Sequence, residues 1–375
     1  MADRYDVVVC GLGAMGSASA YHLARRGARV LGLERFAARH ARGSWHGDSR
    51  IIREMYFEHP LYVPLVQRAY DLWRALERDA GDALMTLHGG LMMGPEDGLL
   101  VAGTLRSARE HALPHELLSP REVAARFPAF RLRDDFVAVH DPRAGFLRPE
   151  ACTDAHRRLA AAHGADLRFE SPALSWTADG DGVRVRTADG DVLADRLLLT
   201  AGGWTTELLN GLHLPLVVER QVTFWFDPPG EEYEPARCPI YAWEHTTGFI
   251  GYGFPRLADG VKAARMHQGE TAAHPDGIRR TIEADEVEPL RDALRQILPA
   301  AADAPVRGGA VCLFTNTPDT DFAIGFHPDH PNVLVSSPCS GHGFKFASAV
   351  GELHADLLLG GSTAFDLAPF SLDRF

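Results

Sequence analysis

Residues 11–16 read Gly11-Leu12-Gly13-Ala14-Met15-Gly16, and they decide the fold of the N-terminal part of the chain. They follow the β-branched run of residues 5–10 and precede residues 17–26, which have the composition of a helix that ends at Gly27. Residues 30–33 then form a second apolar strand that ends at Glu34. A strand, a glycine turn, a helix and a second strand predict a βαβ unit that binds a dinucleotide.

The three glycines of this turn have separate physical roles. Gly11 permits the tight turn, Gly13 lets the backbone approach a pyrophosphate, and Gly16 lets helix and strand pack closely. Glu34 lies about 20 residues further on, where an acid binds a ribose 2′-hydroxyl, and this favours NAD or FAD over NADP. The pattern does not separate NAD from FAD. The alternative interpretation is a glycine-rich turn that holds no ligand.

Composition and charge restrict the class of protein. The chain has 375 residues, 46 % of them apolar, and a formal net charge of −12. The acidic balance disfavours nucleic acid and anionic membrane surfaces as partners, because both attract basic patches. No apolar run is long enough to span a bilayer. The N-terminus has no basic region and enters a strand almost at once, so we expect no secretory signal and a cytoplasmic protein.

The cysteines are odd in number and scattered along the chain. They show no CxxC or Cys/His spacing, so the sequence predicts neither a disulfide framework nor a metal site. A reducing compartment is the best match for this usage. The five residues are Cys10, Cys152, Cys238, Cys312 and Cys339.

Three further segments have the composition of ligand-binding loops. Residues 43–53 are too glycine-rich and polar for a helix interior, and Arg50 and Arg53 in them could serve bound anions; the alternative is a solvated basic loop. Residues 200–204 end a buried strand with small residues, which is typical of a ligand site or of a tight turn. Residues 341–345 read Gly-His-Gly-Phe-Lys before the last expected helix. Glycines at a helix N-terminus favour an anion, and Lys345 could meet a carboxylate, although an isolated lysine more often lies at the surface.

Two extended segments complete the pattern. Cys312 lies in the apolar, strand-like run 310–314, where a cysteine alone is more often structural. Ser119 and Glu122 have the spacing of a capping box at a helix start. Further helices are expected over 62–77, 150–163, 288–297 and 346–359, and strands over 86–94, 167–169, 182–187, 197–200, 219–226, 248–266 and 333–336.

These blocks occur together and in this order in one known family. The chain resembles monomeric sarcosine oxidase and its relatives N-methyltryptophan oxidase, pipecolate oxidase and flavin oxidases of cyclic imino acids, over essentially its whole length. The most specific blocks are Gly-Ala-Val-Cys at 309–312 and Ser-Gly-His-Gly-Phe-Lys-Phe at 340–346. The others are residues 11–16, His-Gly-Asp-Ser-Arg-Ile-Ile-Arg at 46–53 and Tyr-Gly-Phe-Pro at 252–255.

The resemblance implies an α/β fold with two domains. A Rossmann-like FAD-binding domain would be interleaved with an α+β catalytic domain built on a mostly antiparallel sheet. We expect residues 1–85, 150–218 and 320–375 to form the FAD-binding domain. Residues 86–149 and 219–319 would then form the catalytic domain.

The resemblance also implies roles for individual residues. FAD would be linked through its 8α carbon to the sulfur of Cys312. Arg53 and Lys345 would bind the substrate carboxylate, and Tyr252 would line the pocket. Lys262 would lie near the flavin ring where oxygen is activated, because a cation there stabilises developing superoxide.

The cofactor contacts implied by the resemblance come from every part of the chain, and Arg50 would lie near the flavin. The residues expected to contact the cofactor are Gly11, Leu12, Gly13, Ala14, Met15, Gly16, Glu34, Arg35, Ser44, Arg50, Ile51, Ala173, Ala201, Gly202, Trp204, Cys312, Gly341, Gly343, Phe344 and Lys345.

Two positions depart from the family pattern. Relatives usually have a histidine four residues after the lysine, whereas this chain has Met266 there and a histidine at His267. Since one residue of slip on a strand reverses the side chain, either a bulge lets His267 enter the pocket or Met266 faces it, and we favour Met266. Phe314 stands where the sarcosine enzymes have a tyrosine. Loss of the histidine would make the pocket more apolar and favour a larger or flatter substrate, and both changes argue against sarcosine itself.

The implied function is that of an FAD-dependent oxidase of a secondary or N-methylated amino acid. Hydride would pass from the C–H next to nitrogen to flavin N5, an imine would form, and O2 would be reduced to H2O2. The alternatives are an oxidase of a cyclic imino acid of the pipecolate or piperideine carboxylate type, a flavin dehydrogenase with another acceptor, and a nicotinamide-dependent enzyme or a nucleotide-binding protein. The expected partners are a small amino-acid substrate and O2, and the chain is expected to be a monomer or a weak homo-oligomer.

Overall fold

The first of two large sheets is built around the N-terminal strand. The structure is a computed structural model that describes residues 4–375. In this eight-stranded sheet β1 pairs in parallel with β2 and β12, and β12 pairs in parallel with β20. Its strands are β10 (Ser175–Asp179), β11 (Gly182–Thr187), β12 (Gly190–Leu199), β1 (Arg4–Cys10), β2 (Val30–Leu33) and β9 (Asp166–Arg168), with β20 (His330–Ser337) and β19 (Ala323–His327) attached at β12.

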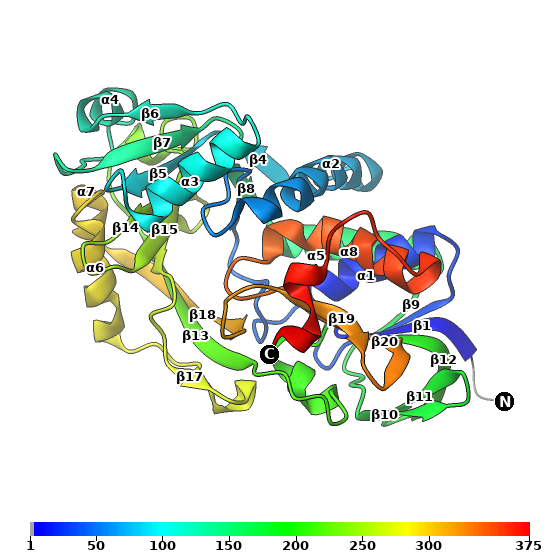
Figure 1. Cartoon of the computed structure of the whole chain (residues 1–375). Helices are drawn as coiled ribbons and strands as arrows, with labels where there is room; N and C mark the ends of the chain where they lie inside the picture. The colour runs from blue at the N-terminus through cyan, green and yellow to red at the C-terminus, as the bar shows by residue number, and fades with distance from the viewer. Residues whose placement is uncertain (1–3) are drawn as a thin grey trace.

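Three helices lie side by side over one face of this sheet (Figure 1). They are α1 (Ala14–Arg25), α5 (Pro149–Ala162) and α8 (Ala347–Ala355), and α2 (Val63–Ala80) packs against α5 and α8. The chain reaches α8 only in its last residues, so the first and last parts of the sequence are packed together. This arrangement brings the glycine turn at residues 11–16 close to the segment that precedes α8.

The second large sheet is mostly antiparallel. Only the β5–β14 pair is parallel among the pairings of its described strands. Its nine strands follow the order β17 (Thr271–Ala272), β13 (Val217–Phe226), β16 (Gly260–Arg265), β15 (Ile250–Leu257), β14 (Ile240–Glu244), β5 (Gly90–Gly94), β7 (Val137–Asp141) and β6 (Glu116–Leu118), with β18 (Val306–Asn316) on β13. The expected fold class is therefore confirmed.

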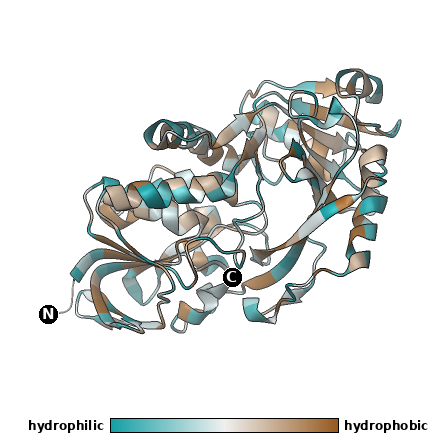
Figure 2. Ribbon diagram, turned by 180° about the vertical axis from the view of Figure 1, so that it is seen from behind, coloured by the Kyte–Doolittle hydropathy of each residue, from teal (hydrophilic) through white to brown (hydrophobic). Residues whose placement is uncertain are grey.

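Smaller elements surround the second sheet. A three-stranded sheet is formed by β3 (Arg50–Ile52), β8 (Gly145–Leu147) and β4 (Met85–Leu87). The helices here are α3 (Leu99–Glu110), α4 (Pro120–Arg126), α6 (Glu288–Leu294) and α7 (Pro299–Ala302). Figure 2 shows hydrophobic residues along the strands of both large sheets and hydrophilic residues on the outer turns of the helices.

Local signals in the sequence gave the correct elements, with some errors at the boundaries. The capping box is confirmed, since Ser119 and Glu122 exchange both hydrogen bonds at the start of α4. The expected strand over 86–94 is wrong in one respect: it is two strands, β4 and β5, because Gly89 has a left-handed φ of 89° and turns the chain from one sheet to another. The last helix is also shorter than expected, since α8 ends at Ala355 and a π-helical turn follows. Strand β10 was not expected.

Over the described residues, no helix combines the length and the apolar character that a membrane crossing needs.

Gly16 tests the packing of α1 against the glycine turn. A Cβ at this position would lie 1.8 Å from the Gly11 carbonyl oxygen, which is backbone and cannot move aside. Gly16→Ala should therefore destabilise the protein by about 3 kcal/mol, as other overpacked sites do. Chemical denaturation measures this loss. Gly360→Ala is the control, since a Cβ there meets nothing within 4 Å, and equal stability of the two variants would contradict the argument.

Candidate active site

One cavity is lined by residues of both large sheets and of the loops between them. Most of the residues singled out in the sequence meet in its wall, although Leu12, Gly16, Lys262 and His267 do not line it. Those that do are Gly11, Gly13, Ala14, Met15, Glu34, Arg35, Ser44, Arg50, Ile51, Arg53, Ala173, Ala201, Gly202, Trp204, Tyr252, Met266, Cys312, Gly341, Gly343, Phe344 and Lys345.

At the glycine turn the wall is formed by the start of α1. Gly13 is the N-cap of α1 and no side chain caps the helix, so its first amide groups are left for a ligand. Glu34 accepts hydrogen bonds from the amides of Leu12, at 2.9 Å, and Phe36, at 3.1 Å. Burial raises the pKa of Glu34, and the two amides oppose that shift. Together these groups fit a pyrophosphate at the helix end and a ribose at the acid.

Several buried polar atoms on the cavity wall have no hydrogen-bond partner within residues 4–375. They include the indole nitrogens of Trp45 and Trp204, the hydroxyl of Thr223 and the hydroxyl of Ser337. Buried polar groups in native proteins are nearly always hydrogen-bonded. These atoms therefore indicate that a ligand with polar groups belongs in the cavity, and the residues present fit a dinucleotide cofactor.

Cys312 on β18 reaches the cavity among basic groups. Its sulfur lies 3.5 Å from Arg50 Nη2 and 3.5 Å from His46 Nε2. Burial alone would raise the pKa of the thiol, but Arg50 and His46, together with Lys262, lower it to about 6. The thiolate, which is the nucleophilic form of cysteine, is therefore favoured at neutral pH.

Lys262 on β16 lies behind the wall and is held by the loop that contains Arg50. Its Nζ donates to the carbonyl oxygens of Gly47, at 2.6 Å, and Ser49, at 3.0 Å, and to the Ser49 hydroxyl at 3.3 Å. Burial, followed by the charge of Arg50, lowers the pKa of Lys262 to about 7. The ammonium group thus links the second large sheet to the loop beside Cys312.

A second group of charges lies where Arg53 and Lys345 line the cavity together. Arg53 donates from Nη2 to both oxygens of Glu58, at 2.8 and 2.7 Å, and from Nη1 to the Met55 carbonyl. The rings of Tyr56 and Phe57 lie 4.4 and 4.6 Å from its guanidinium carbon. Glu58 is therefore the carboxylate that occupies the guanidinium in this structure.

Lys345 adds a second positive charge to this end of the cavity. Its Nζ donates to the His342 carbonyl at 2.7 Å. Burial, followed by the charge of Arg53, lowers the pKa of Lys345 to about 7. Two buried cations share one carboxylate, Glu58, so this end of the cavity suits an anionic ligand such as a carboxylate.

The structure resolves which of two neighbouring side chains faces the cavity. Met266 lines it and His267 does not. Strand β16 is regular opposite β13, and the bulge in this region lies on β15, between Gly253 and Arg256. Strand β16 ends at Arg265, and Met266 begins the turn that follows, with its amide donating to the Ile250 carbonyl at 2.8 Å. Since no bulge interrupts β16, the register is not shifted to admit His267.

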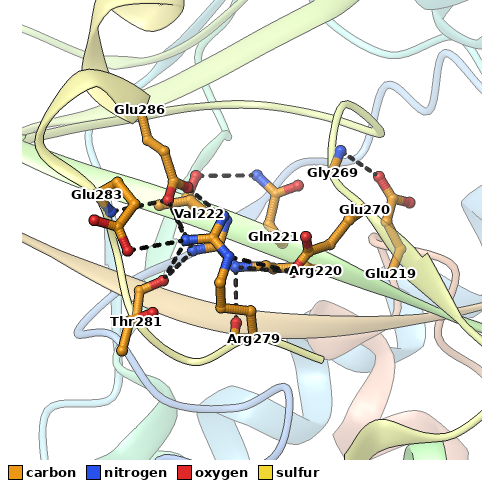
Figure 3. Close-up of polar contacts among 10 residues, drawn as sticks. All are labelled: Glu219, Arg220, Gln221, Val222, Gly269, Glu270, Arg279, Thr281, Glu283 and Glu286. Carbon is orange, nitrogen blue, oxygen red and sulfur yellow. Dashed lines mark hydrogen bonds and ion pairs between the residues drawn. The ribbon is translucent and has the colours of Figure 1, made fainter. Parts of the chain in front are cut away.

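His267 is turned away and anchored to β13. It has a left-handed φ of 54°, and its Nδ1 lies 2.9 Å from the Glu219 carboxylate. Figure 3 shows Glu219 also accepting from the Gly269 amide, at 3.1 Å. On the same face of the strand, Gln221 donates to the Arg265 carbonyl at 2.8 Å. Met266 is thus held between two anchors.

Arg220 binds the later part of the same loop, residues 279–286, on the opposite face of β13 (Figure 3). It is 4 % exposed and donates to the Arg279 carbonyl at 2.8 Å and to Glu286 at 2.5 Å. An exposed arginine, Arg279, donates to the same carboxylate at 2.6 Å. The successive residues of β13 therefore fix the loop on both sides of the sheet.

Sequence reasoning missed some residues that the structure brings to the site. Glu58, His46 and Gln221 all line or contact its charged groups. His46 stands in a block that was singled out, so its place next to a basic loop was a usable signal. No signal in the sequence pointed to Glu58, because a glutamate five residues after Arg53 in an irregular segment fits neither a helix or strand period nor a known motif.

Comparison with known proteins gives consistent matches. A model of the FAD dependent oxidoreductase family matches residues 6–357. Monomeric sarcosine oxidase of Streptomyces avermitilis is 45 % identical over 100 % of this chain and 98 % of its own length. N-methyl-L-tryptophan oxidase of Citrobacter koseri is 37 % identical over 99 % of both chains. The solved structure of NikD, an unusual amino acid oxidase of nikkomycin biosynthesis, has a TM-score of 0.86 at 27 % identity, covering 98 % of this chain and 97 % of its own.

Arg50 should control the ionisation of Cys312. Removal of its charge in Arg50→Met destabilises the thiolate, so the pKa of the thiol should rise from about 6 by one pH unit or more. The thiolate absorbance of flavin-free protein near 240 nm, titrated with pH and corrected with Cys312→Ala, measures this midpoint. The exposed Arg42 of the same loop gives the control variant Arg42→Met, and an unchanged midpoint in Arg50→Met would show that the assignment is wrong.

Proposed function

The chain belongs to the FAD dependent oxidoreductase family, and on this premise we propose that it oxidises a secondary or N-methylated amino acid at the C–H next to nitrogen. The single observation that carries the substrate class is the pair of buried cations, Arg53 and Lys345, in the wall of the cavity that fits the cofactor. The proposal is supported by the names of the relatives, which act on sarcosine and N-methyl-L-tryptophan.

In this proposal different residues of the cavity bind the cofactor, bind the carboxylate of the substrate and surround the reacting carbon. When bound, FAD supplies a hydride acceptor at N5 and passes the electrons on to an acceptor, for which we propose O2 with H2O2 as product. Arg53 and Lys345 bind the carboxylate and fix the orientation of the α-carbon. Their charges lower the pKa of the substrate ammonium, which favours the neutral amine that can release hydride. Tyr252 and Met266 form the wall beside the reacting centre.

We also propose that Cys312 is the attachment point of the flavin. The low pKa of its thiol and its position in the cavity wall support the proposal, because a thiolate is the reactive form. Arg50, which lies 3.5 Å from the sulfur, would then lie beside the ring. Lys262 would lie near it on the other side of the same loop, where a cation favours reduction of oxygen.

The division of the chain into domains follows from the same proposal. Residues 1–85, 150–218 and 320–375 would bind FAD, and residues 86–149 and 219–319 would supply the substrate pocket. The five cysteines are all free, which agrees with the cytoplasmic location that we propose.

A cyclic imino acid is the second candidate substrate. Met266 and Phe314 line the cavity and make its wall apolar, which favours a larger or flatter ring over sarcosine. A thioether also adapts to irregular shapes. A panel of sarcosine, N-methyltryptophan, proline and pipecolate separates the candidates.

Covalent attachment is tested by acid precipitation of the purified protein. We expect a yellow pellet from the wild type and loss of the colour from the pellet in Cys312→Ala, because Arg50 and His46 lower the pKa of the Cys312 thiol, whereas burial raises the pKa of Cys10 on the same wall to about 12. A visible spectrum of pellet and supernatant measures this. Flavin that stays in the wild-type supernatant would remove the covalent link, and a protein without flavin would contradict the proposed function.

Carboxylate binding is tested with Lys345→Met. Loss of one charge-assisted contact should raise KM about 10- to 100-fold while the flavin stays bound. Peroxide release across the substrate panel gives KM, and the visible spectrum gives flavin content. Arg121→Met, which removes an exposed cation on α4, is the matched control and should leave KM unchanged. Wild-type KM in Lys345→Met would count against the assignment of the carboxylate site.

A further inference from the structure

The chain contains only two lysines, Lys262 and Lys345, within a combined total of 38 lysines and arginines. Both are buried beside the cavity, at 2 % and 5 % exposure. An arginine stays charged at every accessible pH, whereas a buried lysine can lose its proton and presents a compact ammonium with three donors. This chain therefore uses lysine only where the environment of the ammonium group is closely controlled, and the surroundings of Lys345 show how.

Two aromatic side chains behind Lys345 form a hydrogen-bonded pair. The Tyr56 hydroxyl lies 2.6 Å from His342 Nδ1, and the Lys345 Nζ lies 3.4 Å from the same hydroxyl. On its other side, His342 Nε2 lies 3.0 Å from the carbonyl oxygen of Thr320. Tyr56 is fully buried and His342 is 6 % exposed, so water does not substitute for these contacts.

The chemistry of the partners fixes the direction of each hydrogen bond that links Thr320, His342, Tyr56 and Lys345. A carbonyl oxygen can only accept, so Nε2 of His342 carries the hydrogen that reaches Thr320. Burial lowers the pKa of His342 to about 4, so the ring is neutral and its Nδ1 is an acceptor. Tyr56 then donates its single hydrogen to Nδ1, at 2.6 Å, rather than to the more distant His342 carbonyl, at 3.4 Å, which already accepts from Lys345. Its oxygen is left able only to accept, and the donor that faces it is Lys345.

We propose that Tyr56 and His342 are a positioning pair for Lys345, in which the phenol oxygen and the His342 carbonyl accept two of the three ammonium hydrogens and leave the third for the carboxylate of the substrate. This inference rests on the proposed function for the identity of the ligand. The ring of Tyr56 contributes a second contact, since Lys345 Nζ lies 5.1 Å from its centroid and Arg53 lies 4.4 Å from it. One aromatic ring thus contacts both cations that face the carboxylate.

The pair also stabilises the charged form of Lys345. The titratable groups that face Lys345 among the described residues are Arg53 and Glu58 from the segment after β3, together with Tyr56 and His342. Burial and Arg53 lower the pKa of Lys345, and Glu58 opposes them. Loss of the phenol oxygen removes an acceptor that only the ammonium form needs. The pKa of Lys345 should then fall further, and carboxylate binding should be lost at a lower pH.

The scarcity of lysine makes a direct measurement possible. Holoenzyme labelled with [ε-13C]lysine gives two lysine signals, which Lys262→Met and Lys345→Met assign. The pH titration of the Lys345 signal is compared between wild type, Tyr56→Phe and Tyr62→Phe. Tyr62 is the matched control, because its ring lies 4.8 Å from that of Tyr56 but its hydroxyl donates to Asp321, at 2.6 Å. Acetate, the simplest carboxylate, is titrated into each protein by calorimetry at several pH values.

We expect Tyr56→Phe to move the Lys345 midpoint to lower pH by about half to one pH unit, and to weaken acetate binding about fivefold near neutral pH. His342→Leu should move the midpoint in the same direction, because the phenol hydrogen is then free to turn toward Lys345. Tyr62→Phe should leave both quantities unchanged. In steady-state kinetics Tyr56→Phe should raise KM more than it lowers kcat.

An unchanged Lys345 midpoint and unchanged acetate affinity in Tyr56→Phe would overturn the inference, as would an equal shift in Tyr62→Phe. These readouts do not depend on turnover. If the expected shifts are found but the wild type releases no peroxide from any secondary amino acid, the proposed function fails and the positioning pair stands.

Discussion

Three buried cations, Arg53, Lys262 and Lys345, and the half-buried Arg50 surround one cavity, and their charges are the constraint on which the rest of the site depends. Arg53 is paired with the Glu58 carboxylate, whereas Arg50, Lys262 and Lys345 donate mainly to carbonyl oxygens. Burial and the neighbouring arginines lower the pKa of both lysines to about 7, because unpaired buried charge is costly. The basic groups around Cys312 lower the pKa of its thiol to about 6. The lowered pKa of the Cys312 thiol and the proposed affinity for a carboxylate have the same electrostatic origin.

The contacts that hold these cations come from backbone as much as from side chains. The carbonyl oxygens of Gly47 and Ser49 accept hydrogen bonds from Lys262 Nζ, and the His342 carbonyl oxygen accepts one from Lys345 Nζ. A carbonyl oxygen stabilises an ammonium group but carries no negative charge that would compete with an incoming carboxylate. Glu58 does carry one, so it would have to release Arg53 or share it when a carboxylate enters. In the proposed function, binding of the substrate carboxylate would therefore be an exchange of carboxylates at Arg53 and an addition at Lys345.

The side chain that faces the cavity at position 266 depends on a different part of the fold, strand β13. Glu219 and Gln221 on one face hold the loop on either side of Met266, and Arg220 on the other face holds its continuation. The alternation of side chains along a strand lets three consecutive residues fix one loop from both sides of the sheet. A thioether rather than an imidazole is thereby presented to the cavity, and His267 is used as an anchor.

The sequence by itself determined the local parts of this protein. The glycine turn, Glu34 and the capping box at Ser119 were predicted because their geometry depends only on residues close together in the chain. The resemblance added the remaining blocks, of which most line one cavity. Only the tertiary structure decided that Glu58 pairs with Arg53, that Met266 faces inward, and that Tyr56 meets His342 across 286 positions. Such contacts follow from how sheets and loops pack, and packing over long separations leaves no periodic signal in the sequence.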